Sequence, residues 1–400
     1  MTRIKPELET FAKIKVVGIG GGGSNAVTRM VTGRMKGVDF ITVNTDAQDL
    51  HHSQAHTKLH IGKNITRGLG AGMNPELGRQ AAEESREEIQ EALKGADLVF
   101  ITSGMGGGTG SGASAVVADV ARSLGALTIA VITKPFTFEG AQRARIAEEA
   151  LIGLRDTVDT LVVIPNDRIF NIISEDTSLV NSFEMVDDIL KQAVFGIADL
   201  ITLPGIINVD FNDIKAIMQD AGSALMGIGF ASGEDRAAKA ARAAINSPLL
   251  ELSIEGAKGV LFNIAGGQDD LKMMEINNAA KIITESVDAG AKIIFGAVND
   301  PRLKKGEIKI TVIATGFGDG TGARGPKKET FIKTAAPTSS APETAQTKKD
   351  SPLAVNVFSK SVENQHADKK LEVKSKTFTP EVTKISDDGW DIPAFIRRKK

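Results

Sequence analysis

Hydrophobic residues along the chain fall into short continuous runs that alternate with amphipathic stretches. The runs last about six residues, as do strands of a sheet that is covered on both faces. Helical periodicity separates them, and this alternation predicts βαβ units in a mostly parallel sheet. We expect strands at Ile14–Ile19, Phe40–Asn44, Leu98–Thr102, Thr128–Thr133 and Thr160–Ile164, and helices at Glu76–Leu93, Ser111–Leu124 and Glu139–Leu154.

A long helical pattern, Ser178–Leu200, follows the first series and ends where Pro204 and Gly205 interrupt it. A second series of strands and helices comes after it. We therefore expect a smaller α/β domain that the long helix joins to the first. The expected strands are Ala224–Phe230, Val260–Ala265, Ile293–Val298 and Ile308–Ala314, and the helices are Phe211–Gln219, Glu234–Ile245 and Asp270–Val287.

The composition changes after Phe317. Residues 319–385 are rich in Lys, Thr, Ser, Ala and Pro and cannot bury a core, which predicts a disordered linker. The last residues differ, because Trp390 and Phe395 come together with two isoleucines before four basic residues. This cluster favours a docking peptide over a tail that folds back on the body.

Composition excludes several classes of protein. The chain has 400 residues, 42% of them hydrophobic, but no run of about 18 apolar residues and no apolar segment at its start, so we expect a cytoplasmic protein without a membrane span. Cysteine is absent, which excludes disulfides and a thiolate nucleophile. The net charge of −2 includes a basic tail, so the body is acidic and nucleic acid is not an expected partner.

Two glycine runs follow strands and open helices. In Gly18–Asn25 the glycines satisfy the GxGxxG pattern, and in Gly104–Gly112 six of nine residues are glycine. Glycines let backbone N–H groups approach a phosphate, and a helix N-terminus adds positive potential. One run alone could be a plain strand-to-helix turn. The pair predicts a triphosphate held between two helix N-termini, and a third loop, Arg67–Pro75, could close over its end.

The sequence resembles the FtsZ family of bacterial tubulin-like division GTPases. The resemblance covers residues 11–318 and the end of the chain, and its motifs occur in the family's order. They are GIGGGGSNAV, VNTD (Val43–Asp46), GLGAGMNPELGR, GGGTGSG (Gly106–Gly112), TKPFTFEG (Thr133–Gly140), PND (Pro165–Asp167), NVDFND (Asn208–Asp213) and DIPAFIRR.

The resemblance implies a tubulin-like α/β fold with six segments. These are an N-terminal extension (1–12), a GTP-binding domain (13–177), a central helix (178–202), a C-terminal activation domain (203–318), a linker (319–385) and a partner-binding peptide (386–400). Within the peptide, the implied contact residues are Asp391, Ile392, Pro393, Phe395 and Ile396.

The resemblance also implies a GTP site, with Mg²⁺ on the phosphates. The implied GTP-binding residues are Gly20, Gly21, Gly22, Gly23, Ser24, Asn25, Asn44, Gly72, Gly107, Gly108, Thr109, Gly110, Glu139, Arg143, Asn166, Phe183 and Asp187. By periodicity alone, Phe183 would be a core residue and Asp187 a boundary residue. Glu139 and Arg143 could equally form an i,i+4 surface ion pair. The resemblance instead places guanine against Phe183 and makes Asp187 its hydrogen-bond acceptor.

The segment Asn208–Asp213 has two interpretations. Asp210 could be the N-cap of the next helix, with Asp213 favouring the helix dipole. The resemblance implies that Asn208, Asp210 and Asp213 are catalytic, inserting into the nucleotide pocket of the next subunit and orienting the attacking water. Such a head-to-tail contact does not close, so it builds a filament.

The resemblance further implies a cytokinetic ring at the division site, attached through the terminal peptide to a membrane-anchoring adaptor and other division proteins. Two other classes stay open from the residues alone. One is a nicotinamide-dependent oxidoreductase that uses Gly18–Gly23, and the other is a tubulin-like protein that binds GTP without hydrolysing it. A metal site among His51, His52, His56 and His60 is not expected, because Lys58–Ile61 has the pattern of a strand.

Overall fold

The computed structural model describes residues 12–317 except 34, 36, 175, 204, 251, 268 and 269. The extension at residues 1–11, the linker and the partner-binding peptide, with Asp391–Ile396, lie outside the described residues. All the elements described here belong to one compact unit.

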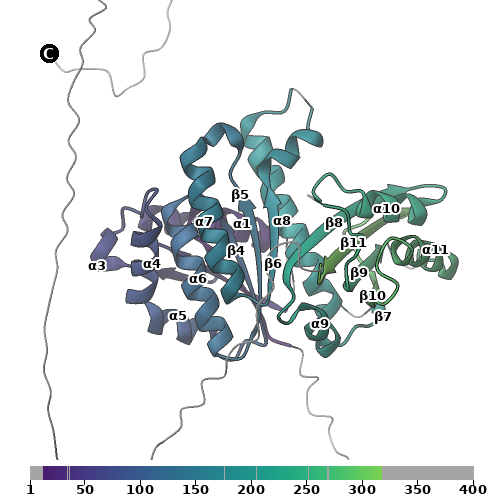
Figure 1. The fold of residues 1–400 in the computed structure, drawn as a ribbon, viewed down its shortest axis with the longest axis horizontal. Helices are drawn as coiled ribbons and strands as arrows, with labels where there is room; N and C mark the ends of the chain where they lie inside the picture. The colour runs from purple at the N-terminus through teal and green to yellow at the C-terminus, as the bar shows by residue number, and fades with distance from the viewer. Residues whose placement is uncertain are drawn as a thin grey trace, which may run out of the picture. The chain divides into compact units, whose positions relative to one another are not determined.

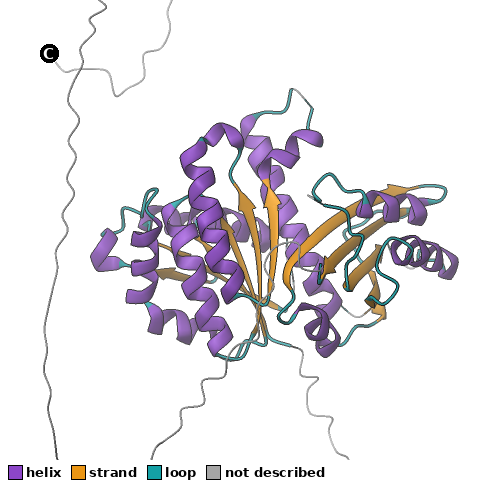
Figure 2. Ribbon diagram, viewed as in Figure 1, coloured by secondary structure: helices purple, strands orange, loops and turns teal. Residues whose placement is uncertain are grey.

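A single sheet of eleven strands runs through this unit, in the order β3-β2-β1-β4-β5-β6-β8-β11-β9-β10-β7 (Figures 1 and 2). The strands are β1 (Ile14–Ile19), β2 (Val38–Asn44), β3 (Thr57–His60), β4 (Leu98–Gly104), β5 (Leu127–Lys134), β6 (Thr160–Pro165), β7 (Gly205–Ile207), β8 (Gly222–Ser232), β9 (Gly259–Gly266), β10 (Lys292–Asn299) and β11 (Glu307–Thr315). The expected strands are all confirmed, each unchanged or extended by one to four residues in total.

The first six strands are parallel, as predicted, whereas β11 is antiparallel to both of its neighbours. The two predicted domains share this sheet, because Thr160, Leu161 and Val162 of β6 pair with the start of β8. The long helix is therefore not the sole connection between the two halves. The domain boundaries themselves stay a prediction.

The helices are α1 (Gly20–Thr32), α2 (Ala47–His52), α3 (Lys63–Thr66), α4 (Pro75–Glu84), α5 (Arg86–Leu93), α6 (Gly108–Ser123), α7 (Ala141–Thr157), α8 (Leu179–Thr202), α9 (Phe211–Met218), α10 (Arg236–Ile245) and α11 (Met273–Thr284), with 3-10 turns η1 (Thr137–Glu139) and η2 (Asn166–Asn171). The single helix predicted over Glu76–Leu93 is wrong, since Ser85 leaves helical geometry at φ −104° and ψ 22° and separates α4 from α5. Its hydroxyl accepts a hydrogen bond from Gly62 N at 3.3 Å.

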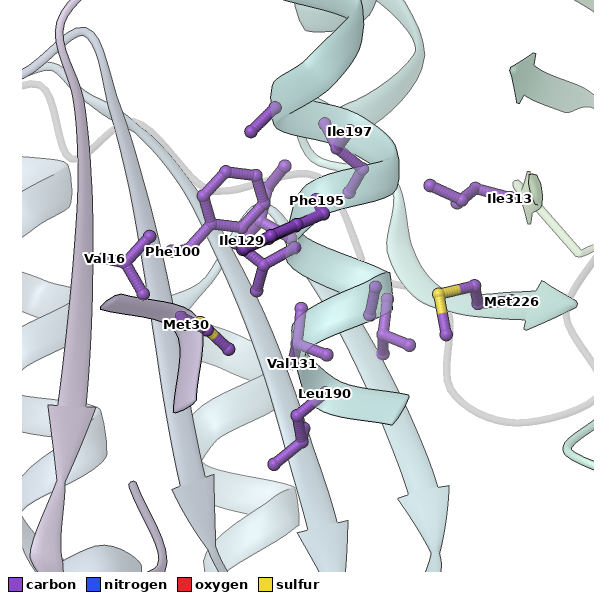
Figure 3. Close-up of a cluster of buried hydrophobic side chains, with 14 of the residues drawn as sticks. Val16, Met30, Phe100, Ile129, Val131, Leu190, Phe195, Ile197, Met226 and Ile313 are labelled. Atoms are coloured by element: carbon purple, nitrogen blue, oxygen red, sulfur yellow. The ribbon is translucent and has the colours of Figure 1, made fainter. Parts of the chain in front are cut away.

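The core has three apolar clusters, and α8 lies between two parts of the sheet. Helices α4 to α7 cover one face of the parallel strands, and α1 and α8 cover the other. Figure 3 shows Leu190, Phe195 and Ile197 of α8 between Val131 of β5 on one side and Met226 of β8 on the other. The opposite face of the second half packs against α10 and α11. This packing fixes the second half of α8 relative to the sheet.

Candidate functional site

A cavity of about 470 Å³ opens at the carboxyl ends of the parallel strands, between the N-termini of α1 and α6 and the first half of α8. Carboxyl ends of such strands are the usual place of ligands in α/β sheets. The predicted residues that line the cavity are Gly20, Gly21, Gly22, Asn25, Gly72, Gly107, Gly108, Thr109, Gly110, Glu139, Arg143, Asn166, Phe183 and Asp187. Both glycine runs, the third loop and the long helix thus meet in one site.

The two glycine runs touch, and the contact requires glycine. Gly20 has φ +70°, and a Cβ on it would lie 3.0 Å from Gly110 N. A Cβ on Gly22 would lie 3.3 Å from Gly104 N. Neither α1 nor α6 has a side-chain cap at its N-terminus. In α6 the N–H of Gly108 donates to Gly72 O, and the following N–H groups of the first turn are open to a ligand. This arrangement suits an anion such as phosphate.

Positive charge is scarce in the cavity. Among the described lining residues Arg143 is the one cation, and its Nη1 donates to Glu139 Oε2 at 2.9 Å. The ion pair predicted for these two residues is therefore present, at the edge of the cavity. Because this cation is already paired, binding of an anion here depends mainly on backbone N–H groups and helix dipoles.

Three predicted residues lie behind the lining. A Cβ on Gly23 would lie 2.5 Å from Thr102 O, so this glycine lets α1 pack closely against β4. Ser24 is buried. Asn44 is also buried, and its Nδ2 donates to Asp49 Oδ2 at 2.6 Å. These positions support the phosphate-type loop from behind, and their contact with nucleotide stays a prediction.

The third loop closes one end of the cavity. Gly108 N donates to Gly72 O at 2.6 Å, which fixes this loop to the start of α6. Thr45 and Thr109 share a buried hydrogen bond of 2.6 Å between their hydroxyls. Thr45 O also accepts from Gly70 N at 3.3 Å. The loop after β2, the second glycine run and the third loop therefore hold one another in position.

The other end of the cavity is aromatic. The Phe183 ring stands edge-on to Phe136, with centroids 5.3 Å apart, and Phe138 and Phe170 lie at 5.0 and 5.4 Å from Phe136. Phe183 is 40% exposed and lines the cavity, so the periodicity-based prediction of a core residue is wrong. The first turns of α8 project beyond the sheet, which exposes a helix face that is buried further along. An exposed ring in a cavity suits the face of a planar base.

Asp187 lies one helical turn from Phe183 and is mostly buried, with 16% of its side chain exposed. Arg29 Nε donates to Asp187 Oδ2 at 3.1 Å, and Arg29 Nη2 reaches Glu184 at 2.8 Å. Burial raises the pKa of Asp187 to about 6, even though Arg29 works in the opposite direction. The carboxylate is thus a strong acceptor that still has lone pairs free for a donor in the cavity.

Asn166 offers a second polar group at the aromatic end. It is buried at the start of η2, and its Oδ1 has no hydrogen-bond partner among the described residues. A buried acceptor without a partner costs free energy unless a ligand satisfies it. Asn166 therefore points to a ligand with hydrogen-bond donors at this end.

Several lining residues were not predicted. They are Ile19, Gly104, Met105, Thr133, Pro135, Val186 and Leu190. Gly104 and Met105 stand in the second glycine run, and Thr133 and Pro135 stand in the TKPFTFEG motif, so both motifs pointed to them. Ile19, Val186 and Leu190 carry no sequence signal, because apolar residues in a strand or helix indicate only burial.

The segment Asn208–Asp213 lies elsewhere. None of its residues lines the cavity. Asp210 occupies the N-cap position of α9, but its side chain makes no capping hydrogen bond, so the predicted side-chain cap is wrong. Asp210 and Asp213 are both exposed, and Asn208 Oδ1 accepts from Gly205 N at 2.7 Å. The two carboxylates are therefore accessible to a partner.

The long helix separates this segment from the cavity. Phe183 and Asp187 lie in the first half of α8, whereas Asp210 is the N-cap of α9, which follows the other end of α8 in the chain. A helix of 24 residues is about 36 Å long. One chain cannot bring Asp210 and Phe183 to the same small ligand.

The histidines do not form one helical face. His51 and His52 are in α2, and His60 is in β3, as the strand pattern predicted. Within residues 12–317, no group of three His, Cys, Asp or Glu side chains could hold a metal ion in the parts that the structure describes.

Comparison with protein families gives two matches. The model of the Tubulin/FtsZ family GTPase domain matches residues 13–174. The model of the FtsZ family C-terminal domain matches residues 222–318. Together they span both halves of the sheet.

Solved structures agree with these matches. The structure of an FtsZ dimer from M. jannaschii is 45% identical in sequence to this chain. The match covers 77% of this chain and 89% of the FtsZ chain, with a TM-score of 0.74. CetZ2 from Haloferax volcanii, described as a GTPγS-bound protofilament, is 21% identical over 76% of this chain and 92% of that chain, with a TM-score of 0.65. CetZ1 from the same organism, a GDP-bound monomer, is 23% identical over 77% and 95%, with a TM-score of 0.66. The two CetZ structures support the fold alone.

Proposed function

The chain belongs to the FtsZ family of Tubulin/FtsZ GTPases, and from this premise we propose that its cavity binds GTP with the triphosphate between the two glycine runs. The observation that carries the proposal is the meeting of two uncapped helix N-termini with an aromatic, acceptor-rich end in one cavity. A nicotinamide-binding protein needs one such loop, whereas a triphosphate makes use of both.

The base would lie against Phe183. Asp187 would accept from the guanine N1–H and 2-amino groups, and Asn166 would add a further polar contact. Adenine lacks both donors and would leave the buried Asp187 carboxylate with fewer partners, so ATP should bind much more weakly. Glu139 and Arg143 would contact the ribose and the phosphates from the edge of the cavity.

The substrate would be Mg·GTP. Since the described residues contain no ready-made set of metal ligands, the ion would be held chiefly by phosphate oxygens and water. It would supply charge neutralisation on the phosphates, while the chain's own residues bind and orient the nucleotide.

Hydrolysis would take place between two subunits. The length of α8 keeps Asp210 and Asp213 away from their own cavity, and both carboxylates are exposed. We propose that they enter the cavity of the next subunit and orient the attacking water near the γ-phosphate, with Asn208 positioning their loop. Each subunit then has a nucleotide face and a catalytic face, and the repeated contact builds a head-to-tail filament.

In the cell, such filaments would form the cytokinetic ring at the inner face of the membrane. No helix that the structure describes in residues 12–317 has the length and apolar character of a membrane span. Attachment would come from the terminal peptide, with Asp391–Ile396 binding an adaptor and other division proteins. A chain that lacks residues 386–400 should hydrolyse GTP normally and fail to join the ring.

GTP hydrolysis per subunit, measured over a range of protein concentrations, tests the proposal. We expect a threshold followed by a rising rate, because the active site forms only on association. Binding of ATP and NAD serves as the control for specificity. A rate per subunit that does not depend on concentration would refute catalysis between subunits, and binding of NAD without hydrolysis of GTP would refute the whole proposal.

A further inference from the structure

A carboxylate lies directly beside the first glycine run. Asp49, in the one-and-a-half-turn helix α2, has its Oδ2 2.6 Å from Asn44 Nδ2. A Cβ placed on Gly21 would lie 3.5 Å from the same oxygen, which is ordinary van der Waals contact. Asp49 does not line the cavity, whereas Gly21 does. The carboxylate therefore lies beside Gly21, a residue that lines the cavity, with room for about one methyl group between them.

The geometry of Asp49 is held from two sides. Its backbone N donates to Asp46 Oδ1 at 3.1 Å, which ties it to the N-cap of α2. Its carboxylate is fixed by Asn44, which is buried at the end of β2 and whose own Oδ1 accepts from Asp46 N at 3.3 Å. The side chain therefore cannot turn away from the loop without losing the hydrogen bond to Asn44.

The negative charge of Asp49 has no ion-pair partner in the part of the chain that the structure describes. Within the described residues, Asp49 forms no ion pair with a Lys, Arg or His side chain. The charged groups that act on it are the carboxylate of Asp46, at the N-cap of α2, and His52, at the end of α2. Burial and Asp46 both raise the pKa of Asp49 above its ordinary value, which reflects an environment that disfavours further negative charge.

Resting on the proposed function, we propose that Asp49 is a specificity-determining residue. Its negative charge lowers the affinity for a nucleotide more with each additional phosphate charge, so GTP and GDP differ less in affinity than they would without it. A fixed negative charge beside a phosphate site repels a bound phosphate, and the repulsion grows with the charge of the ligand. Among the described residues that line the cavity, Arg143 is the one cation that could offset this charge, and it is already paired with Glu139. Asp49 touches neither the nucleotide nor the attacking water, so it would act on affinity and not on chemistry.

Binding of guanosine, GMP, GDP and GTP to the full chain, in EDTA at low salt, compares the natural protein with Asp49→Asn. Asparagine keeps an oxygen that accepts from Asn44 and removes the charge. We expect no change for guanosine, a small gain for GMP, and a gain of about three- to tenfold for GTP that exceeds the gain for GDP. Excess Mg²⁺ and higher salt should both shrink the gain, because each reduces the effective charge of the phosphates.

Asp39→Asn is the matched control. Asp39 is an exposed carboxylate near the start of β2, five residues and about 17 Å of strand away from Asn44, so the same charge change there should leave all four affinities unchanged. Asp49→Ser provides a second uncharged variant in case Asp49→Asn folds poorly. Its gain in affinity should also be largest for GTP, smaller for GDP and GMP, and absent for guanosine.

Three results would overturn the inference while leaving GTP binding itself in place. One is an unchanged ratio of GTP to GDP affinity. Another is an equal change for guanosine and GTP, which would mark Asp49 as a structural support of Asn44. The last is a weaker affinity for GTP in the presence of Mg²⁺, which would make Asp49 a partner of the ion. A natural chain that binds no guanine nucleotide would overturn the proposed function and this inference together.

Discussion

The Arg29 guanidinium donates from Nε to Asp187 Oδ2 at 3.1 Å, so the acceptor proposed for guanine is held from one side by a cation of α1. Arg29 also pairs with Glu184 at 2.8 Å. This arrangement leaves Asp187 fixed in direction and facing the cavity. It also places a mostly buried carboxylate at the nucleotide end of α8, where its ionisation has a cost in the free chain.

Replacing that carboxylate should stabilise the free protein and impair its function. The pKa of Asp187 is raised to about 6, so its ionised form is disfavoured by folding. Asp187→Asn should raise the free energy of unfolding by about 1–3 kcal/mol at pH 7. The gain is fully present above pH 6 and fades as the pH falls towards 4, because the natural carboxyl is then protonated in the folded state.

Denaturant unfolding between pH 4 and 8, without nucleotide, measures this gain. The same variant should bind GTP at least tenfold more weakly at pH 7. Asp188→Asn, a more exposed neighbour that pairs with Lys191 at 2.6 Å, is the control and should do neither. A free energy of unfolding that does not rise in Asp187→Asn would contradict a cost of ionising the buried Asp187.

Removing the ring of Phe183 should weaken nucleotide binding more than folding. Stacking of a base on an aromatic side chain contributes about 1–3 kcal/mol, so Phe183→Ala should lower the affinity for GTP by tenfold or more. Phe183 is 40% exposed, and the loss of stability should be modest. Phe230→Ala, at a 54% exposed position in β8, is the control for loss of a surface ring. Equal affinities in the two variants would argue against a base at Phe183.

The contact between α4 and α6 depends on small residues. A Cβ on Gly112 would overlap the carbonyl oxygen of Pro75 and lie 2.6 Å from Arg79 N. Gly112→Ala should therefore lower the free energy of unfolding by about 3 kcal/mol or more, because backbone cannot move aside as a flexible side chain can. Gly153→Ala, in α7 with open space around it, should instead raise it by about 0.5–1 kcal/mol. Urea unfolding of both variants tests the pair, and a neutral Gly112→Ala would contradict the packing.

Arg302 joins the second half of the sheet to α8. It bonds to Asp300 at 2.6 Å from Nε and to the buried Asp199 of α8, and its guanidinium lies 5.2 Å from the centroid of the Phe195 ring. Among the described residues, Arg302→Ala leaves the two buried carboxylates with Lys309 as the remaining cation of this cluster, so the free energy of unfolding should fall by about 3–5 kcal/mol.

Arg145→Ala is the matched control, because Arg145 and Glu149 form an exposed i,i+4 pair whose contribution to stability is small. Thermal or urea unfolding distinguishes the two. Similar small effects would mean that water, and not Arg302, satisfies Asp199.

Much of the fold could be predicted from the sequence because buried strands are continuous apolar runs. The strand ends differ by a few residues, as at β8, which begins at Gly222 where the apolar pattern begins at Ala224. The short strand β7 and the break at Ser85 could not be predicted. The strand has three residues, and the break depends on a hydroxyl that bonds to the distant Gly62. Both are decided by tertiary contacts.

The site residues could be predicted where binding requires a particular residue type. They could not be predicted where any apolar side chain of suitable size would line the cavity. Positions 20 and 110 require glycine because the two backbones approach each other closely there. The glycine motifs in the sequence therefore predicted both positions. Leu190 lines the cavity with no such requirement. The exposure of Phe183 contradicts its helical periodicity, because that pattern cannot tell where a helix leaves its sheet.

If the aspartates of one subunit act in the cavity of another, two variants that are each inactive should restore hydrolysis when they are mixed. Asp213→Ala keeps its cavity and loses a catalytic carboxylate. Gly107→Glu keeps the carboxylates and blocks its own cavity, since the position has open space around it and the new side chain would add bulk and negative charge where phosphate binds. Each alone should hydrolyse GTP at least a hundredfold more slowly than the natural chain. Mixed in equal amounts they should recover a substantial part of its rate, whereas a mixture as inactive as its components would contradict catalysis between subunits.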